Sequence, residues 1–193
     1  MGFLERQVDV HSLAGRPPLA VVRVVLKPAA ADDVPPVRDL HARSFATLAR
    51  SHHRKNEMAA QLALIRSPDY AGELLGANLA LAVDGGGRIV ATGGWQPMPS
   101  RPGTARIRKI FVEPALARQG LGRLMVSDAE ARARRSGFND FYVRANLNAV
   151  PLYQALGYRE IAEGLMALDG GVSLPVVFME KTRAMTESPG AQP

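Results

Sequence analysis

The sequence contains no cysteine, few aromatic residues and no long apolar run. Of the 193 residues, 6% are aromatic and none is Cys. The absence of cysteine excludes disulfides, thiolate catalysis and cysteine-containing zinc sites. No apolar segment approaches the roughly 18 residues that a membrane span requires. The N-terminal "MGFLERQVDV" lacks the basic and apolar regions of a secretory signal. A soluble, cytoplasmic protein without a membrane partner is therefore expected.

Positive charge is concentrated in one part of the chain. Between positions 101 and 135 there are nine basic and three acidic residues, an excess that equals the net charge of +6. A nucleic-acid binder more often spreads its charge along a face, and no helix-turn-helix or aromatic platform accompanies this charge. The concentration around the glycines of "RQGLGR" (118–123) therefore indicates one compact anion as the ligand, and no nucleic acid.

The apolar pattern predicts a single domain of class α/β over residues 19–183. Residues 1–18 are expected to be peripheral and residues 184–193 to form a disordered tail. Strands are predicted at 21–27, on both sides of a glycine turn within 78–95, and at 105–112, 140–145, 158–164 and 174–180. Helices are predicted from the caps Asp32 and Asp33 to Leu48, and at 57–66, 119–136 and 148–156.

The glycine loop has the features of an anion cradle. Gly120 and Gly122 have no Cβ, and they open a helix whose first N–H groups lack partners and carry partial positive charge. Arg118 and Arg123 add full charges. A glycine turn before an ordinary helix is the other interpretation of this short motif.

Two familiar phosphate motifs do not fit the loop. A P-loop requires Lys and Ser or Thr after the glycines, whereas Gly122 is followed by Arg123 and Leu124. A dinucleotide fingerprint requires a third small residue where the chain has Met125, and an acid after the next strand, which ends in Arg144 and Ala145.

Two neighbouring blocks together resemble the GNAT superfamily of N-acetyltransferases. "IRKIFVEPALARQGLGRLM" (107–125) is similar to its strand, glycine loop and helix, and "YVRANLNAVPLYQALGYREI" (142–161) to the motif that follows. The resemblance implies one mixed, mostly antiparallel sheet of about six to seven strands with about four helices. It also implies a V-shaped splay between strands 107–112 and 141–145.

The resemblance further implies acetyl-CoA as co-substrate, no metal, and transfer of the acetyl group to the amine of a small molecule or peptide. The chain departs from the motif at Ala117, where the family has Gln or Arg. The cofactor-binding residues that it implies are Ile110, Phe111, Val112, Arg118, Gln119, Gly120, Leu121, Gly122, Arg123, Asn148 and Tyr153.

Tyr153 occupies the position at which the resemblance places a catalytic tyrosine, beside the sulfur of CoA. Its phenol is a suitable proton donor to a departing thiolate; packing beside Leu152 and Leu156 is the other interpretation. Asn148 is expected to contact the cofactor arm, to cap the short helix, or both. No residue is predicted as the general base, and the buried spacing of His41 favours packing.

The sequence leaves the acceptor open among small amines, polyamines, antibiotics, amino acids and protein N-termini. His52, His53, Glu57, Asp69 and Trp95 lie in regions expected near the acceptor. Solvated helix charge is the favoured interpretation of Glu57 and Asp69, and a core position is the other interpretation of Trp95. A CoA-binding sensor or interaction module without catalysis is the alternative function. The formation of a homodimer is also left open.

Overall fold

One mixed sheet forms the centre of the molecule. The computed structural model describes residues 7–10 and 22–183. Eight strands lie in the order β1-β2-β3-β4-β5-β6-β8-β7. All neighbours are antiparallel except β5 and β6, which are parallel. The strands are β1 (Gln7–Val10), β2 (Val22–Pro28), β3 (Ala80–Asp84), β4 (Ile89–Pro97), β5 (Thr104–Val112), β6 (Asp140–Asn146), β7 (Arg159–Ala167) and β8 (Ser173–Lys181).

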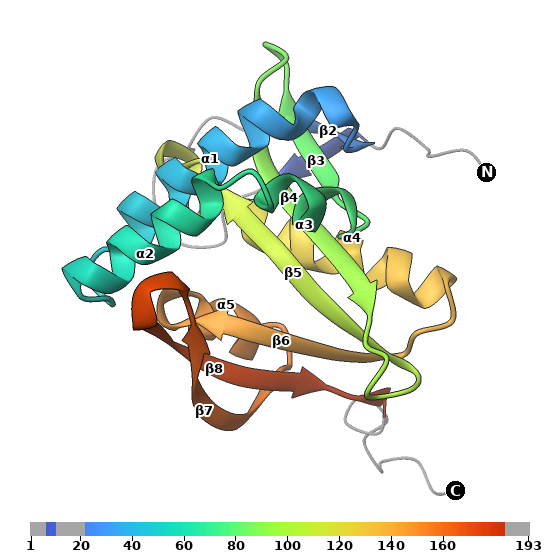
Figure 1. Ribbon diagram of the computed structural model, residues 1–193. Coiled ribbons are helices and arrows are strands. Elements are labelled where there is room, and N and C mark those ends of the chain that lie inside the picture. Colours follow the sequence, from blue (N-terminus) through green and yellow to red (C-terminus); the bar gives the residue numbers. More distant parts are fainter. Residues whose placement is uncertain (1–6, 11–21, 184–193) are drawn as a thin grey trace, which may run out of the picture.

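Helices cover both faces of this sheet. In the view of Figure 1, α1 to α3 lie in front of the half that contains β2 to β5, whereas α4 and α5 lie behind the sheet. The helices are α1 (Val34–Leu48), α2 (Lys55–Arg66), α3 (Tyr70–Leu75), α4 (Leu121–Arg135) and α5 (Val150–Gln154). Short 3-10 helices lie at Ala31–Asp33, Pro114–Leu116, Leu147–Ala149 and Asp169–Gly171.

The strands β5 and β6 are paired only at one end. Their register runs from Thr104 opposite Asp140 to Ile107 opposite Val143 and then stops. Beyond that point β5 continues beside β4 to Val112, and β6 continues beside β8 to Asn146. The two strands diverge in Figure 1. The predicted splay is thus confirmed, and it leaves two unpaired strand edges inside the sheet.

The predicted fold class is correct, and three details differ. The sheet contains β1, which lies within residues 1–18 and was not predicted, so it has eight strands instead of six or seven. The six-residue α3 was missed because it follows Pro68 and is too short to show a period. The short helix predicted at 148–156 is divided into a 3-10 turn and α5. The predicted tail at 184–193 lies outside the described residues.

Candidate active site

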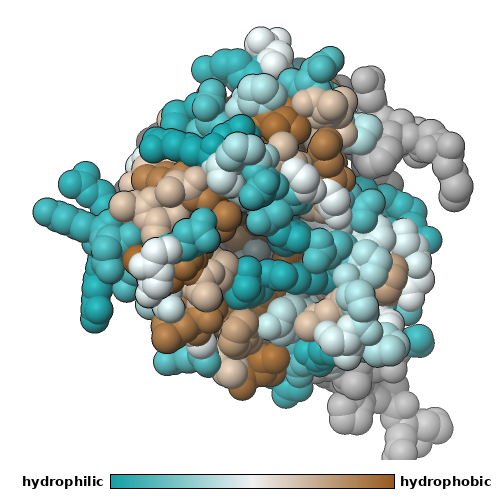
Figure 2. Space-filling model, viewed as in Figure 1, coloured by the Kyte–Doolittle hydropathy of each residue, from teal (hydrophilic) through white to brown (hydrophobic). Residues whose placement is uncertain are grey.

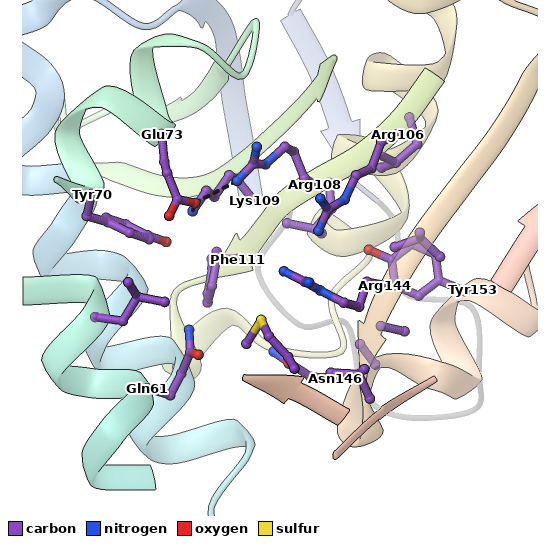
Figure 3. Close-up of a pocket in the computed structure, with 18 residues that line it drawn as sticks. Gln61, Tyr70, Glu73, Arg106, Arg108, Lys109, Phe111, Arg144, Asn146 and Tyr153 are labelled. Atoms are coloured by element: carbon purple, nitrogen blue, oxygen red, sulfur yellow. Dashed lines mark hydrogen bonds and ion pairs between the residues drawn. The ribbon is translucent and has the colours of Figure 1, made fainter. Parts of the chain in front are cut away.

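A cleft opens where β5 and β6 separate. It has a volume of about 140 Å³ and is lined by residues of these strands and of α2, α3, α5 and β8. Figure 2 shows a hollow at this place, bordered by hydrophilic and hydrophobic residues, and Figure 3 shows the side chains that enter it. The cleft joins the two faces of the sheet, because it receives side chains from helices in front of the sheet and behind it.

The edge of β5 presents backbone amides to this cleft. The N–H of Glu113 donates to Val90 on β4 at 2.8 Å, and Phe111 is in register with Thr92 of β4. Because backbone groups alternate along a strand, the amide of Phe111 also faces β4. The amides of Ile110 and Val112 therefore face the side on which β6 has moved away. Phe111 instead lines the cleft with its ring.

A β-bulge interrupts β5 just before these amides. Thr92 of β4 lies opposite Phe111 and Gly94 opposite Arg108, so one extra residue is accommodated on β5. Lys109 in this bulge has φ of 59°, which is unusual for a residue with a side chain. The bulge keeps Ile110 against α4 behind the sheet, while the side chain of Lys109 reaches Glu73 on α3 in front.

A buried chain of hydrogen bonds holds this bulge. The Thr92 hydroxyl donates to the carbonyl of Lys109 at 2.7 Å, so it accepts from Nε2 of His41 at 2.8 Å. Nδ1 of His41 therefore accepts from the Tyr70 hydroxyl at 2.9 Å. Burial, followed by the charge of Lys109, lowers the pKa of His41 well below its usual value and keeps the ring neutral. His41 thus packs, as the sequence indicated, and also fixes the backbone of β5.

Four cations and one carboxylate surround the front of the cleft. Arg106, Arg108 and Lys109 come from β5, Arg144 comes from β6, and Glu73 comes from α3. Glu73 accepts hydrogen bonds from Arg108 at 2.6 Å and from Lys109 at 2.8 Å. Burial alone would raise the pKa of Glu73, but these two partners lower it. The carboxylate is therefore a poor general base.

Tyr153 extends from α5 into the cleft. Its side chain is 4% exposed, its ring packs edge-on against Tyr158, and its hydroxyl points into the space between β5 and β6 in Figure 3. Burial raises the pKa of this phenol above its usual value. The hydroxyl therefore stays protonated at neutral pH and is available as a donor.

The two asparagines at the end of β6 and just beyond it have different environments. Asn148 lies in the 3-10 turn Leu147–Ala149, where no side-chain cap forms. Its Oδ1 is buried and has no hydrogen-bond partner among the described residues. Asn146 instead lines the cleft and was missed in the sequence. Its position at the last residue of β6 is the signal that could have identified it.

The glycine loop begins α4, as predicted. Gly120 is the N-cap residue with φ of 90°, and no side chain caps the first turn. A Cβ on Gly122 would lie 3.1 Å from Cδ2 of Leu152, so this glycine allows α4 to approach α5 closely. Arg118 is exposed, and Nη2 of Arg123 lies 3.4 Å from the carbonyl of Ala155 on the α5 side. The loop thus adjoins the helix that carries Tyr153.

Two other loop residues have mainly structural contacts. Nε2 of Gln119 lies 3.5 Å from the carbonyl of Ala115, and Leu121 is buried in the core beside Met125. Their backbone N–H groups remain the relevant feature of this loop.

The basic residues do not all gather at this loop, which corrects the sequence interpretation. Arg101 pairs with Glu180 on β8, Arg132 with Asp128 and Arg134 with Glu130. Three others of that group lie on β5 and enter the cleft. The alternation of Arg106 and Arg108 along a strand was the signal that they share one face.

The weaker candidates do not line the cleft. Glu57 accepts from the backbone N–H of Arg54 at the start of α2, and Trp95 packs against Phe138. His52 and Asp69 are exposed outside the cleft. Among residues 7–10 and 22–183, no three His, Asp or Glu residues cluster so that they could hold a metal ion. No helix in this described part is both long and apolar enough to cross a membrane.

Comparisons with known proteins agree on one family. The model of the acetyltransferase (GNAT) family matches residues 37–158. No curated protein sequence matches the chain. Similar solved structures include a GCN5-related N-acetyltransferase from Rhodopseudomonas palustris, with a TM-score of 0.74 and 18% identity over 87% of this chain and 99% of that chain.

Two further structures were solved with the cofactor. The PaiA N-acetyltransferase of Thermoplasma acidophilum, in complex with coenzyme A, has a TM-score of 0.62 and 10% identity over 82% of this chain and 98% of that chain. A phosphinothricin acetyltransferase of Sinorhizobium meliloti, in complex with acetyl-CoA, has a TM-score of 0.57 and 19% identity over 88% of this chain and 96% of that chain. At these identities the similarity shows a shared fold.

Proposed function

Because the chain belongs to the GNAT acetyltransferase family, we propose that it transfers the acetyl group of acetyl-CoA directly to a primary amine. The observation that carries this proposal is the gap in the sheet, where unpaired amides of β5 and the hydroxyl of Tyr153 meet in one cleft. Acetyl transfer requires groups of these two kinds, one for the oxyanion and one for the departing sulfur.

The glycine loop is the proposed site for the pyrophosphate of acetyl-CoA. The uncapped N–H groups at Leu121, Gly122 and Arg123 suit an anion because they lack partners at a helix N-terminus. Arg118 and Gln119 precede them, and Gly120 permits the turn through its positive φ. Two proteins of similar fold were solved with coenzyme A or acetyl-CoA, which supports acetyl-CoA as the co-substrate.

The pantetheine arm is proposed to fill the gap as an additional strand. The amides of Ile110 and Val112 would hydrogen-bond to it, while the ring of Phe111 would form part of the cleft wall. Two asparagines could bind the arm. Asn146 lines the cleft, and Asn148 has a buried Oδ1 without a partner among the described residues. A buried polar atom without a partner is costly, so a ligand N–H at Asn148 would be stabilising.

Transfer then proceeds in one displacement. The neutral amine attacks the thioester carbonyl carbon, the C–N bond forms, and the tetrahedral oxyanion is stabilised by backbone N–H groups of β5. The C–S bond breaks as the hydroxyl of Tyr153 gives its proton to the sulfur. The proton lost by the amine passes to water, from which the phenolate is protonated again. The neutral phenol that burial maintains is the form this step requires.

The experiment is a kinetic comparison of wild type with Tyr153→Phe. Because the chain has no cysteine, every thiol that appears during turnover comes from CoA. Loss of the phenolic proton should lower kcat by roughly 10²-fold, with little change in acetyl-CoA affinity, because the donor acts in the transition state.

Tyr158→Phe is the matched control, since the Tyr158 ring touches Tyr153 but its hydroxyl donates to Glu130 at 3.0 Å. Near-normal kcat in Tyr153→Phe would return Tyr153 to a packing role. An increase in Tm with acetyl-CoA, without turnover of any amine, would indicate the non-catalytic sensor instead.

A further inference from the structure

The front of the cleft contains more positive charge than its own carboxylate neutralises. Four cations face one acid, Glu73, and this acid is already shared by Arg108 and Lys109. Arg106 and Arg144 have no carboxylate partner within 4.0 Å among the described residues. Three positive charges are thus uncompensated in a partly buried site.

This arrangement is costly in the free protein. Burial, and then the charges of Arg144 and Arg108, lower the pKa of Arg106 to about 10. Burial and Arg108 also lower the pKa of Arg144. The Nε atoms of Arg106 and Arg108 are buried without a hydrogen-bond partner in the described part of the chain. Unpaired charges and unused donors of this kind are relieved when an anion binds.

The position of these four cations indicates whether the bound anion belongs to acetyl-CoA or to the acceptor. Side chains of β5 alternate, so Ala105, Ile107 and Ile110 pack on the α4 side of the sheet, and Arg106 and Arg108 project to the opposite side. The uncapped start of α4, where the phosphates of acetyl-CoA are proposed to bind, belongs to the rear layer of the fold. The anion in front of the sheet therefore belongs to the acceptor.

Arg106 on β5 and Arg144 on β6 face the same side of the sheet. Arg106 is in register with Tyr142 on β6, and Arg144 is the second residue after Tyr142, so Arg106 and Arg144 lie on the same face of the two strands. The guanidinium group of Arg108 is already bonded to Gln96 and Glu73. Arg106 and Arg144 both line the cleft that Tyr153 also lines, and Figure 3 shows the three side chains there. An anion at these arginines lies beside the reacting centre.

We propose that the acceptor is a small amine that also carries a carboxylate or another oxyanion, which Arg106 and Arg144 bind while the amine faces the bulge in β5. This inference rests on the proposed acetyl transfer. Guanidinium groups bind carboxylate and phosphate-like groups with two parallel hydrogen bonds. The cleft of about 140 Å³ must also receive the thioester end of the pantetheine arm, so the acceptor group that enters it is small.

The test is an acceptor screen in matched sets with release of CoA thiol as the readout. Each set contains an amino acid, its amide, its decarboxylated amine and the aminophosphonate of the same carbon skeleton. The anionic members should have kcat/KM at least about 10²-fold above the neutral and cationic members, since an unpaired buried charge discriminates strongly. The carboxylate and phosphonate arms identify which oxyanion the site prefers.

Variants then connect this preference to the cluster. Arg106→Gln and Arg144→Gln should each raise KM for the anionic acceptor by about 10-fold or more, with acetyl-CoA affinity unchanged. Arg144→Lys should recover part of the loss because it restores the charge without the planar group. Arg159→Gln, an exposed arginine on the edge strand β7, is the matched control and should behave as wild type.

The outcomes separate this inference from the function on which it rests. Efficient acetylation of polyamines or neutral amines, or an unchanged KM in both Gln variants, would overturn the anionic acceptor and leave acetyl transfer intact. Turnover of acidic peptides alone would overturn the small acceptor. Absence of turnover with every amine, of any charge, would overturn acetyl transfer and this inference together.

Discussion

At the scale of the residue, His41 joins the core to the reacting strand. Its ring is fully buried, stacks on Phe111 at a centroid distance of 3.9 Å, and links Tyr70 to Thr92. The hydrogen-bond directions require the neutral ring, because Nδ1 accepts and Nε2 donates. Protonation of His41 would make Nδ1 a second donor, although its partner, the Tyr70 hydroxyl, also donates.

This requirement predicts acid sensitivity. The native pKa of His41 lies below the usual value of 6.5, so between these two values only the unfolded state takes up the proton. Stability is therefore fully present above pH 6.5 and falls as the pH decreases, by about 1.4 kcal/mol per pH unit from this group. In His41→Gln, the free energy of unfolding in urea should depend on pH with a slope smaller by that amount below about pH 6.5, and with the wild-type slope above it.

The same variant should lose roughly 1–3 kcal/mol at neutral pH, because the ring packing and one buried hydrogen bond are disturbed. His52→Gln, at an exposed position, is the control and should retain the wild-type slope. An identical acid slope in His41→Gln and wild type would show that His41 is not held neutral.

At the scale of the element, α4 is framed by two glycines with nearly equal φ angles. Gly120 precedes its first turn with φ of 90°, and Gly137 follows its last turn with φ of 91°. The N–H of Gly137 donates to Arg134, and the N–H of Phe138 donates to Ala133, which closes the C-terminal end. The two glycines share a positive φ, but only the N-terminal end is proposed to bind acetyl-CoA.

Alanine variants of these two glycines separate an effect on stability from an effect on binding. Gly120→Ala and Gly137→Ala should each destabilise the fold by about 1–2 kcal/mol, because both place a side chain in the left-handed region. Only Gly120→Ala should also weaken acetyl-CoA binding, by about 10-fold, since it turns the free N–H groups away from the pyrophosphate. Calorimetry on both folded variants measures this difference. Equal affinity in the two would remove the glycine loop from the binding site.

Elements with a local signal were predictable, and those that depend on distant contacts were not. The glycine turn between β3 and β4, the apolar stripe of α4 and the strand β5 all follow from short patterns. The bulge at Lys109 depends on Thr92 and His41, which are far away in sequence. For the same reason the site could be predicted as a loop and a tyrosine, but the arginine cluster required the parallel pairing of β5 with β6.

At the scale of the whole molecule, basic side chains lie on two different faces. Arg118 lies at the glycine loop of α4, whereas the cluster of β5 and β6 faces the front of the cleft. The phosphates of acetyl-CoA should therefore be attracted mainly by the charges near the loop.

The ionic-strength dependence of acetyl-CoA binding tests this division. Arg118→Ala should weaken binding and flatten its dependence on salt, since exposed charges are screened over about 10 Å at 0.1 M salt. Arg135→Ala, at the opposite end of α4 and also exposed, should change neither quantity. Unchanged binding and salt dependence in Arg118→Ala would place the phosphates away from this loop.

The gap between β5 and β6 also has a consequence for amide hydrogen exchange. The backbone N–H groups on an unpaired strand edge hydrogen-bond only to water until a ligand pairs with that edge. In the free protein the amides of Ile110 and Val112 should exchange rapidly, although they belong to a central strand, while the amide of Phe111 between them is protected by β4. Saturation with acetyl-CoA should protect Ile110 and Val112 and leave Phe111 unchanged, an alternation with a period of two residues. Uniform protection of all three would mean that the cofactor tightens the whole sheet without pairing to this edge.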